Sequence, residues 1–377
     1  MIRTLLLILC LGLTYSINNG VKVIDNKQIN DNKPNNNIVR IVAVGDNLIH
    51  NSVLKSGKIN DSTYNFNRLF EVMKSDFQEA DIAIINQETI LGGNFRPYDG
   101  YPNFNSPFEL GDAIIEAGFD VVLQASNHTL DVGTQGVYNC IEYWKQHKNI
   151  KYLGINESQE ERDEIKIIEK NGIKFALLNY TYGLNGRTLP KDKSFLVNLI
   201  DTTLIINDLR RAEQIADFTI VFPHWGEEYV YKPNKNQRQL AKLMTENGAD
   251  LIIGTHSHVL QSIEWIECDN GNKALCYYSL GNYTSGQLAY PRVLGGMAKI
   301  TIVNDSDSIY IDQAGIIPII THYEWVKGTS LHKTYKLSDY TEKLEKRHSL
   351  NYYDSTFSIK NLQQLADQII GDWIINQ

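Results

Sequence analysis

Short apolar runs alternate with helically spaced segments through the first two thirds of the chain. The runs are rich in β-branched residues and predict strands, whereas apolar residues three and four apart predict helices between them. The strands are predicted at residues 38–44, 81–85, 120–125, 165–169, 173–180, 218–222 and 250–253, and the helices at residues 68–80, 107–119, 134–147, 201–214 and 236–246. This alternation predicts an α/β fold with a largely buried sheet.

The last third of the chain carries a different pattern, in which apolar segments follow one another closely. They predict antiparallel strands at residues 263–267, 274–280, 298–303 and 309–320. The sheet system is therefore expected to be mixed. Two further helices are predicted near residues 338–348 and 359–370. We expect one domain over residues 38–320 and a helical extension over residues 321–377 that packs on it.

The N-terminus has the order of a secretory signal. Arg3 precedes a continuous apolar run over residues 5–13, and Thr14 and Ser16 supply small residues where a signal peptidase reads the chain. This order predicts a signal over residues 1–16 and an exported protein of the periplasm or cell surface. The apolar run is too short to span a bilayer comfortably.

Three alternatives for this segment remain open. It could be a buried first strand or helix, or it could stay uncleaved and tether the protein to a membrane. It could also carry a lipid on Cys10, although Leu9 stands where a small residue is wanted. Residues 17–37 are rich in Asn, Lys and Asp and predict a disordered tether.

Composition and charge narrow the classes of partner. Hydrophobic residues make up 42% of the 377 residues and charged residues 21%, which is ordinary for a globular protein with a sizeable core. The formal net charge is −8, and no block of Lys and Arg is present. These features argue against a nucleic acid or an anionic membrane as the partner.

Ligand-type side chains follow five of the predicted strands at the point where each strand stops. They are Asp46 with His50, Glu88, Asn127 with His128, His224, and His256 with His258. The carboxyl ends of strands in an α/β sheet converge on one crevice, so we expect these side chains to lie together. Carboxylate, amide and imidazole groups delivered to one edge predict a metal site.

Each of these residues has a simpler explanation when taken alone. Asp46 could cap a turn, and Glu88 could be a solvated loop acid. The His256-x-His258 pair is more specific, because alternate residues on an extended chain face one side. The joint pattern favours two divalent cations, for which Mn, Fe, Zn and Mg all remain open. Such a pair clamps the attacking and leaving oxygens of a displacement and activates water.

Six sequence blocks, in their order along the chain, resemble the CapA family. They are Gly45-Asp46-x-x-x-His50, Asn86-x-Glu88, Asn127-His128-x-x-Asp131-x-Gly133, His224-Trp225-Gly226-x-Glu228, the run from Gly248 to Gln261, and Ser279-Leu280-Gly281-Asn282-Tyr283. The resemblance covers about residues 38–300. That family is associated with poly-γ-glutamate capsule synthesis and resembles calcineurin-like metallophosphoesterases. It implies a four-layer, mixed-sheet α/β sandwich of the metallophosphoesterase type.

The resemblance also implies roles for individual residues. It implies metal binding by Asp46, Glu88, Asn127, His224, His256 and His258. His50 corresponds less clearly, because the phosphoesterase motif separates Asp and His by one residue and this chain by three. His128 resembles a histidine that contacts substrate phosphate or protonates the leaving group, and Asp131 is placed to orient it. Asn282 resembles a substrate contact.

Three positions depart from the family's pattern. Thr255 stands where the family often has His, and Ser257 stands where it usually has Pro. Gly286 stands where an acid is expected after the Gly-Asn-Tyr block. The last departure concerns a distal substrate contact and leaves the expected metal site intact.

Three functional hypotheses follow. The first is an exported metal-dependent hydrolase that serves the assembly of a capsule or envelope polymer, either poly-γ-glutamate or a capsular polysaccharide. The second is a general phosphoesterase that acts on nucleotides or sugar phosphates. The third is a non-catalytic capsule assembly or export component. The expected partners are an envelope polymer or a phosphorylated small molecule, together with a membrane complex of capsule synthesis.

The export hypothesis has a direct test at the N-terminus. N-terminal sequencing of the mature protein from its native host should begin near Ile17, because cleavage after Ser16 fits the small residues that a signal peptidase reads. An intact Met1 on cytoplasmic material would contradict export.

Overall fold

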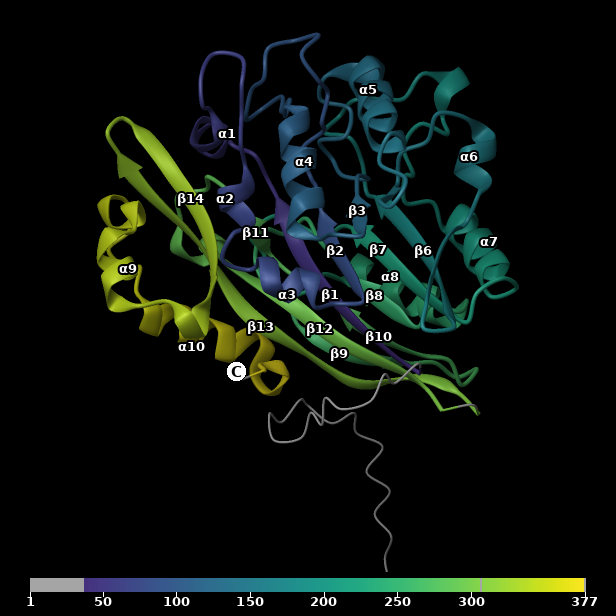
Figure 1. Ribbon diagram of the computed structural model, residues 1–377. Coiled ribbons are helices and arrows are strands. Elements are labelled where there is room, and N and C mark those ends of the chain that lie inside the picture. The colour runs from purple at the N-terminus through teal and green to yellow at the C-terminus, as the bar shows by residue number, and fades with distance from the viewer. Residues whose placement is uncertain (1–36, 306, 376–377) are drawn as a thin grey trace, which may run out of the picture.

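The computed structural model describes residues 37–305 and 307–375. Two β-sheets lie against each other, and helices cover their outer sides (Figure 1). Within the described residues, the larger sheet has the order β14-β13-β12-β1-β2-β3-β4, with β11 paired to β1, and the smaller has the order β5-β6-β7-β8-β10-β9. The predicted signal, and the predicted tether apart from residue 37, lie outside the described residues.

Both sheets are mixed, as the sequence predicts. The larger sheet comprises β1 (Ile38–Asn47), β2 (Ile82–Asn86), β3 (Val121–Leu123), β4 (Lys151–Leu153), β11 (Asn282–Thr284), β12 (Leu294–Asn304), β13 (Ile309–Val326) and β14 (Thr329–Lys336). The smaller comprises β5 (Lys166–Lys170), β6 (Ile173–Thr181), β7 (Phe218–His224), β8 (Leu251–Ile253), β9 (Ile263–Glu267) and β10 (Lys273–Tyr277). Parallel pairs join β1 to β2, β3 and β4 in turn, and β6 to β7, β8 and β10.

The helices lie mostly between the parallel strands in the sequence. They are α1 (Asn51–Gly57), α2 (Asn67–Phe70), α3 (Lys74–Gln78), α4 (Phe108–Ala117), α5 (Gly133–Lys145), α6 (Gln159–Asp163), α7 (Thr202–Ala212), α8 (Lys235–Glu246), α9 (Glu342–Arg347) and α10 (Ile359–Ile370). In the part of the chain that the structure describes, no helix has the length and apolar character needed to cross a membrane.

Three hydrophobic clusters separate four layers. On β1, Val42 and Val44 face the cluster under α2 to α5, whereas Ile41 and Ala43 face the other sheet. On β6, residues 175 and 177 belong to the same cluster between the two sheets as Ile41 and Ala43, whereas residues 176 and 178 face α7 and α8. Alternate residues of a strand point to opposite faces, so continuous apolar runs are needed when both faces are covered. The layers are therefore helix, sheet, sheet and helix, which confirms the predicted four-layer α/β sandwich.

The differences from the predicted elements are local. The single helix predicted over residues 68–80 is divided into α2 and α3. Strand β13 continues past residue 320, and β14 follows it, so the extension predicted as helical begins with strands. The two helices predicted within it are present as α9 and α10.

An aspartate clasp recurs where four parallel strands begin. In each clasp, an Asp just before one strand uses Oδ2 to accept the N–H of a residue on the preceding strand, and its own N–H donates to the C=O of that same residue. The clasps join Asp81 to Arg40, Asp120 to Ala83, Asp217 to Lys174, and Asp250 to Thr219, with N···Oδ2 distances of 2.7 to 2.8 Å. These paired contacts fix the strand register at that end of both sheets.

The clasp at Asp250 predicts a pH dependence of stability. Burial raises the pKa of its carboxyl to about 7, although the hydrogen bond from Thr219 opposes the shift. A native pKa above the unfolded value means that the native state binds more protons between about pH 4 and 7, so this contribution to the free energy of unfolding falls as pH rises. Asp250→Asn mimics the protonated acid and removes that loss.

Urea unfolding from pH 4.5 to 7.5 measures this effect. The free energy of unfolding of Asp250→Asn, measured relative to wild type, should increase by at least about 1.4 kcal/mol from pH 4.5 to pH 7.5. This increase corresponds to one pKa unit. Asp217→Asn is the matched control, because Asp217 makes the same clasp and is exposed. An equal pH response of the two variants would contradict the prediction.

Candidate metal centre

Strand ends from both sheets meet at one place. Asp46, Glu88 and Asn127 follow or end strands β1, β2 and β3 of the larger sheet. His224 ends β7, and His256 follows β8, both in the smaller sheet. Carboxylates and an amide thus come from one sheet and imidazoles from the other.

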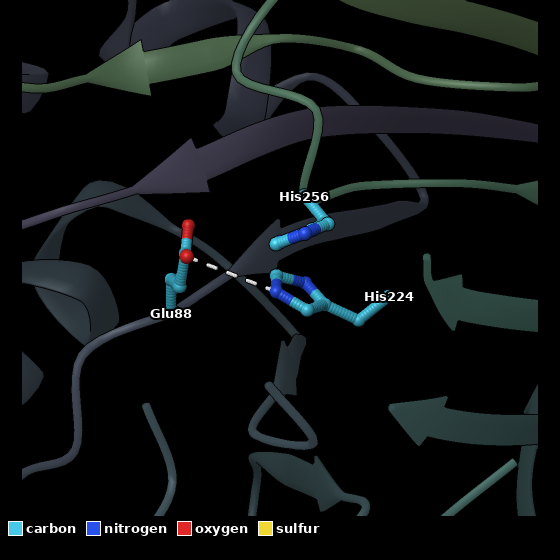
Figure 2. Close-up of side chains that lie close together, drawn as sticks. All are labelled: Glu88, His224 and His256. Atoms are coloured by element: carbon cyan, nitrogen blue, oxygen red, sulfur yellow. Dashed lines mark ion pairs between the residues drawn. The ribbon is translucent and has the colours of Figure 1, made fainter. Parts of the chain in front are cut away.

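Glu88 lies between two imidazoles of the smaller sheet. Its Oε1 is 3.7 Å from Nε2 of His224, and its Oε2 is 3.7 Å from Nδ1 of His258. Figure 2 shows the Glu88 carboxylate facing the His224 ring, with His256 beside it. Ligand-type atoms of Glu88, His224 and His256 all lie within 4.8 Å of one another. Their positions would suit a single metal ion.

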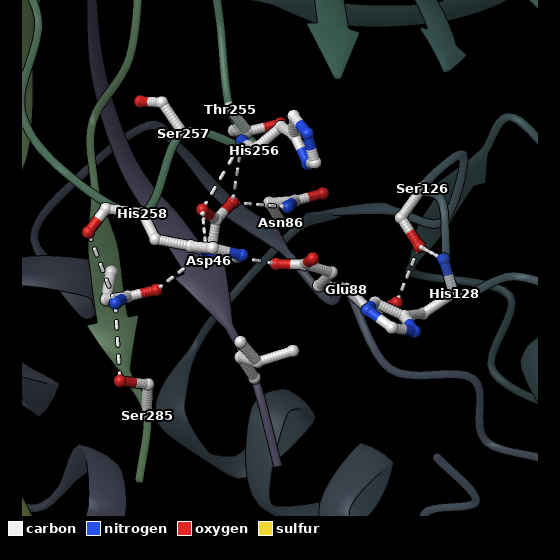
Figure 3. Close-up of polar contacts among 12 residues, drawn as sticks. Asp46, Asn86, Glu88, Ser126, His128, Thr255, His256, Ser257, His258 and Ser285 are labelled. Carbon is white, nitrogen blue, oxygen red and sulfur yellow. Dashed lines mark hydrogen bonds and ion pairs between the residues drawn. The ribbon is translucent and has the colours of Figure 1, made fainter. Parts of the chain in front are cut away.

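A second group of side chains shares the same carboxylate. Ligand-type atoms of Asp46, Glu88 and His258 also lie within 4.8 Å of one another. Asp46 Oδ2 is 3.0 Å from His258 Nδ1, and Asn86 donates its side-chain N–H to Asp46 Oδ1 at 2.8 Å (Figure 3). The backbone N–H of His256 also points at Asp46. Asp46 is therefore held by residues of both sheets.

Buried polar atoms without partners fit a bound cation. Neither carboxylate oxygen of Glu88 has a hydrogen-bond partner among the described residues, and neither does Nδ1 of His256. Glu88 is 1% exposed and His256 is 2% exposed. Buried polar groups are normally satisfied, so orphan atoms on these neighbouring residues indicate a missing polar partner.

The pKa values of these groups also fit a bound cation. Burial raises the pKa of the Glu88 carboxyl well above its usual range and lowers the pKa values of His224 and His256. Burial also acts to lower the pKa of His258, but Glu88 and Asp46 outweigh it and raise the value to about 9. Neutral imidazoles bind metals, so the lowered pKa values of His224 and His256 favour the ligand form. A divalent cation would favour the ionised form of Glu88 that burial disfavours, and it would take the place of the proton that Glu88 and Asp46 hold on His258. The donor set therefore fits a divalent metal ion.

The two histidines after β8 have unusual backbone angles. His256 has a φ of 98° and His258 a φ of 57°, in the region that favours glycine. They reach the centre through this bend, and not on the extended chain that the sequence argument assumed. Such conformations cost free energy and cluster at functional sites.

His224 is oriented from both ends of its ring. Nε2 lies 2.8 Å from Oδ1 of Asn127, and Nδ1 lies 2.9 Å from the hydroxyl of Thr255. Asn127 Oδ1 and His224 Nε2 are thus close enough for both to bind one ion. Thr255, a departure from the family's pattern, positions the ring through its second nitrogen.

His128 and Asp131 lie beside these ligands and contact each other. Nδ1 of His128 is 2.7 Å from Oδ2 of Asp131, which also accepts the backbone N–H of Phe104 at 2.9 Å. The Phe104 ring packs edge-on against the His128 ring at 4.6 Å. This contact agrees with the arrangement implied by the resemblance, and it fixes the orientation of the imidazole.

His50 is placed differently from the other expected ligands. It belongs to none of the ligand groups found among the described residues. Its Nδ1 accepts the backbone N–H of Gly286 at 3.2 Å. A side chain at position 286 would collide with His50 and Ser52, because a Cβ atom there would lie 2.4 Å from the Ser52 hydroxyl oxygen. This close approach explains why glycine replaces the expected acid.

Asn282, which the resemblance implies as a substrate contact, lies beside His258 and is enclosed by protein groups. It is completely buried, and its Oδ1 lies 3.1 Å from Nδ1 of His258. Its amide N–H groups contact Gln287 Oε1 and the carbonyl of Arg292. Because protein groups surround the amide, Asn282 holds His258 in place and does not face solvent.

Four residues near the centre were missed by the sequence analysis. Glu228 forms a third group of ligand-type atoms with His256 and His258. Asn86 binds Asp46, and Asn185 and Arg187 lie against the His128–Asp131 pair. The signals were present, since Asn86 and Glu228 stand inside the recognised blocks, and the loop with Asn185 and Arg187 follows a predicted strand.

Comparisons with known proteins identify the family of this chain. The family model described as "Bacterial capsule synthesis protein PGA_cap" matches residues 40–287. The "PGA biosynthesis protein CapA" of Bacillus subtilis is 31% identical over 58% of this chain and 57% of its own length. The "Capsule biosynthesis protein CapA" of Bacillus anthracis is 32% identical over 52% and 47%, respectively. The chain thus matches about half the length of these relatives.

Among solved structures, the "calcineurin-like phosphoesterase YfkN from Bacillus subtilis" resembles this chain with a TM-score of 0.40 and 12% identity, over 88% of this chain and 97% of that one. The matched family model covers well over half of the present chain. This protein therefore belongs to the family of bacterial capsule synthesis proteins of the PGA_cap type.

Proposed function

We propose that this protein is an exported, metal-dependent hydrolase that serves the synthesis of a capsule or envelope polymer. The observation that carries the proposal is the position of Glu88, which is shared by two groups of ligand-type side chains. Glu88 also lies near His128 (Figure 3) and feels the charge of Asp131. A shared carboxylate can bridge two cations, and the histidine supplies the proton transfer that hydrolysis requires.

The proposed centre is dinuclear. Glu88, His224, His256 and Asn127 would hold one ion, and Asp46, Glu88 and His258 the other. Glu228 would be able to reach the mouth of the second position, since it is exposed and groups with His256 and His258. Two divalent cations held by these residues would supply the charge that activates a water molecule and stabilises the leaving oxygen.

The side chains around the ions have separate tasks in this proposal. Asp131 accepts the Nδ1–H of His128, so that Nε2 is the nitrogen presented to the substrate. In the imidazolium form, Nε2–H would donate its proton to the leaving group and leave the ring as the neutral Nδ1–H tautomer. Phe104 packs against the ring and excludes water from one of its sides. Asp131 holds the His128 imidazole in this tautomer and orientation.

Membership of the capsule synthesis family supports a polymer as the substrate or product. The names of the relatives refer to PGA and to capsule, and on our proposal this chain serves poly-γ-glutamate or a capsular polysaccharide. Export to the periplasm or cell surface, and a membrane complex of capsule synthesis as a partner, belong to the same proposal.

A general phosphoesterase is the second candidate. The contact between His128 and Asp131 favours it, because a histidine fixed beside two cations suits the alkoxide leaving group of a phosphoester. Turnover of simple nucleotides or sugar phosphates with added manganese or zinc would favour this candidate over a polymer-specific enzyme.

Metal stoichiometry tests the shared role of Glu88. Wild-type protein loaded with manganese should contain two ions per chain by elemental analysis. Asp46→Asn and His224→Ala should each retain about one, because each removes a ligand from only one group, and Glu88→Gln should lose part of both. His50→Ala is the control and should retain two. One ion in wild type, or loss of an ion in His50→Ala, would contradict this assignment.

The roles of the two kinds of histidine can be separated by mutation. His256→Ala should lose metal, because water replaces an imidazole ligand poorly. His128→Ala should retain metal and lower phosphoester turnover by about 10²–10⁴, the usual contribution of general acid catalysis. Metal content, melting temperature and turnover should be measured on both variants.

Two outcomes would change the interpretation of that experiment. A His128→Ala protein with a lower melting temperature and unchanged turnover per folded molecule would make His128 a structural residue. Wild type that holds metal and hydrolyses neither phosphoester nor amide substrates would make the protein a non-catalytic assembly component.

A further inference from the structure

A sixth strand end, that of β6, reaches the metal centre. The segment over residues 182–187 follows β6 directly, and its backbone joins the centre where the N–H of Tyr182 donates to the carbonyl of His224 at 3.0 Å. None of its residues belongs to the ligand groups found among the described residues. The segment therefore borders the centre without supplying its metal ligands.

The first residue of this loop forms one wall of an uncharged pocket. The Tyr182 ring lies 4.6 Å from the His256 ring and is 47% exposed. Beside it is a pocket of about 270 Å³, whose walls include the Trp225 ring and the amides of Asn234 and Gln237. Every lining side chain of this pocket is uncharged. An uncharged wall with an exposed tyrosine ring suits a polar, uncharged ligand such as a sugar or an amide unit.

The middle of the loop contacts the proton-transfer pair. Asn185 Nδ2 is 3.3 Å from His128 Nδ1, and Asn185 Oδ1 accepts from Asn127 Nδ2 at 3.1 Å. Asn185 has a φ of 50°, which Asn tolerates better than most residues. The hydrogen bond from Asn127 fixes Asn185 in the loop, and its amide group lies against the imidazole of His128.

The end of the loop brings a guanidinium to the other side of the pair. Nε of Arg187 lies 3.9 Å from Asp131 Oδ1, and one of its terminal nitrogens donates to Asn103. Oδ2 of Asp131 is already engaged by His128 and by the N–H of Phe104. The Arg187 side chain is 39% exposed, and its other terminal nitrogen has no partner among the described residues. It can therefore bind an anion that enters from solvent.

We propose that residues 182–187 form the substrate-binding loop of the centre. Arg187 binds an oxyanion of the substrate beside His128, and the pocket next to Tyr182 takes the polar, uncharged unit attached to that oxyanion. This inference rests on the proposed metal centre. A phosphate and a carboxylate both satisfy the guanidinium, so the experiment includes one probe of each kind.

The test measures binding to the manganese-loaded full-length protein by calorimetry. The probes are inorganic phosphate, a sugar phosphonate whose C–P bond resists hydrolysis, and a glutamate tripeptide. The variants are Arg187→Gln, Arg187→Lys and Tyr182→Ala, and the control is Arg238→Gln, which removes an exposed arginine that pairs with Glu264. Metal content and melting temperature are recorded for each variant.

Arg187→Gln should weaken the binding of every anion that wild type binds by about 10-fold or more, with unchanged metal content, because a charge-assisted contact is lost. Arg187→Lys should bind anions with an affinity between those of wild type and Arg187→Gln, since the charge remains and the planar guanidinium is lost. Tyr182→Ala should keep the affinity for inorganic phosphate within about twofold of wild type and should lower the affinity for the two larger probes about fivefold or more. Tighter binding of the phosphonate than of the tripeptide assigns the site to phosphate, and the reverse assigns it to carboxylate.

Two results would overturn the assignment of the loop. One is an Arg187→Gln protein that binds anions as well as Arg238→Gln does. The other is wild type that holds manganese and binds none of the three probes. Wild type that binds no manganese would instead overturn the metal centre on which the inference rests, so the two failures are distinguishable.

Discussion

The arrangement of the whole centre depends on one buried carboxylate. Glu88 is almost fully removed from water, and neither of its oxygens has a hydrogen-bond partner among the described residues. Burying an unpaired carboxylate costs on the order of several kcal/mol, so the surrounding groups must supply positive charge or keep the acid neutral. The imidazoles of His224 and His258 flank it at 3.7 Å and lead to the two possible ion positions.

The same strands begin at an aspartate clasp and lead, at their other end, to an expected ligand of the metal centre. Asp81, Asp120 and Asp217 are each followed seven residues later by Glu88, Asn127 and His224, respectively, and Asp250 is followed six residues later by His256. The clasps align the starting ends of neighbouring strands. Because the spacing from clasp to ligand is six or seven residues in each case, neighbouring segments that start in register deliver their ligands to the same edge.

This periodicity explains how much the sequence could predict. The strand cores and the ligand-type residues after them were recognisable, because apolar runs and the polar residues that end them are local features. The division into two sheets was not apparent from the runs themselves. Strands buried on both faces have the same apolar pattern in either sheet, and only long-range packing decides which sheet each joins. Strand β14 was missed because polar residues such as His332 and Thr334 interrupt its apolar positions.

The side chains were harder to assign than the strands. His50 has the residue type and the position of a ligand, yet its partner is the backbone of Gly286. Asn282 stands in a recognised block but is buried behind His258. Both outcomes depend on segments more than 20 residues away in sequence, which no local pattern encodes. Arg187 was missed for the same reason, since its proximity to Asp131 arises only when β6 and β3 belong to facing sheets.

The expected ligands and the proposed substrate contacts are attached to the fold in different ways. The ligands stand on or immediately after strands whose register is fixed from the opposite end, and groups on rigid elements hold their geometry well. Tyr182, Asn185 and Arg187 lie on a connecting loop that is partly exposed. A loop can change its side chains without disturbing the sheets, whereas a change at Glu88 would leave buried imidazoles without their counter-charge. In the proposed centre, the strand ends therefore fix the metal ligands, and the loop after β6 is the part that can vary to change the substrate contacts.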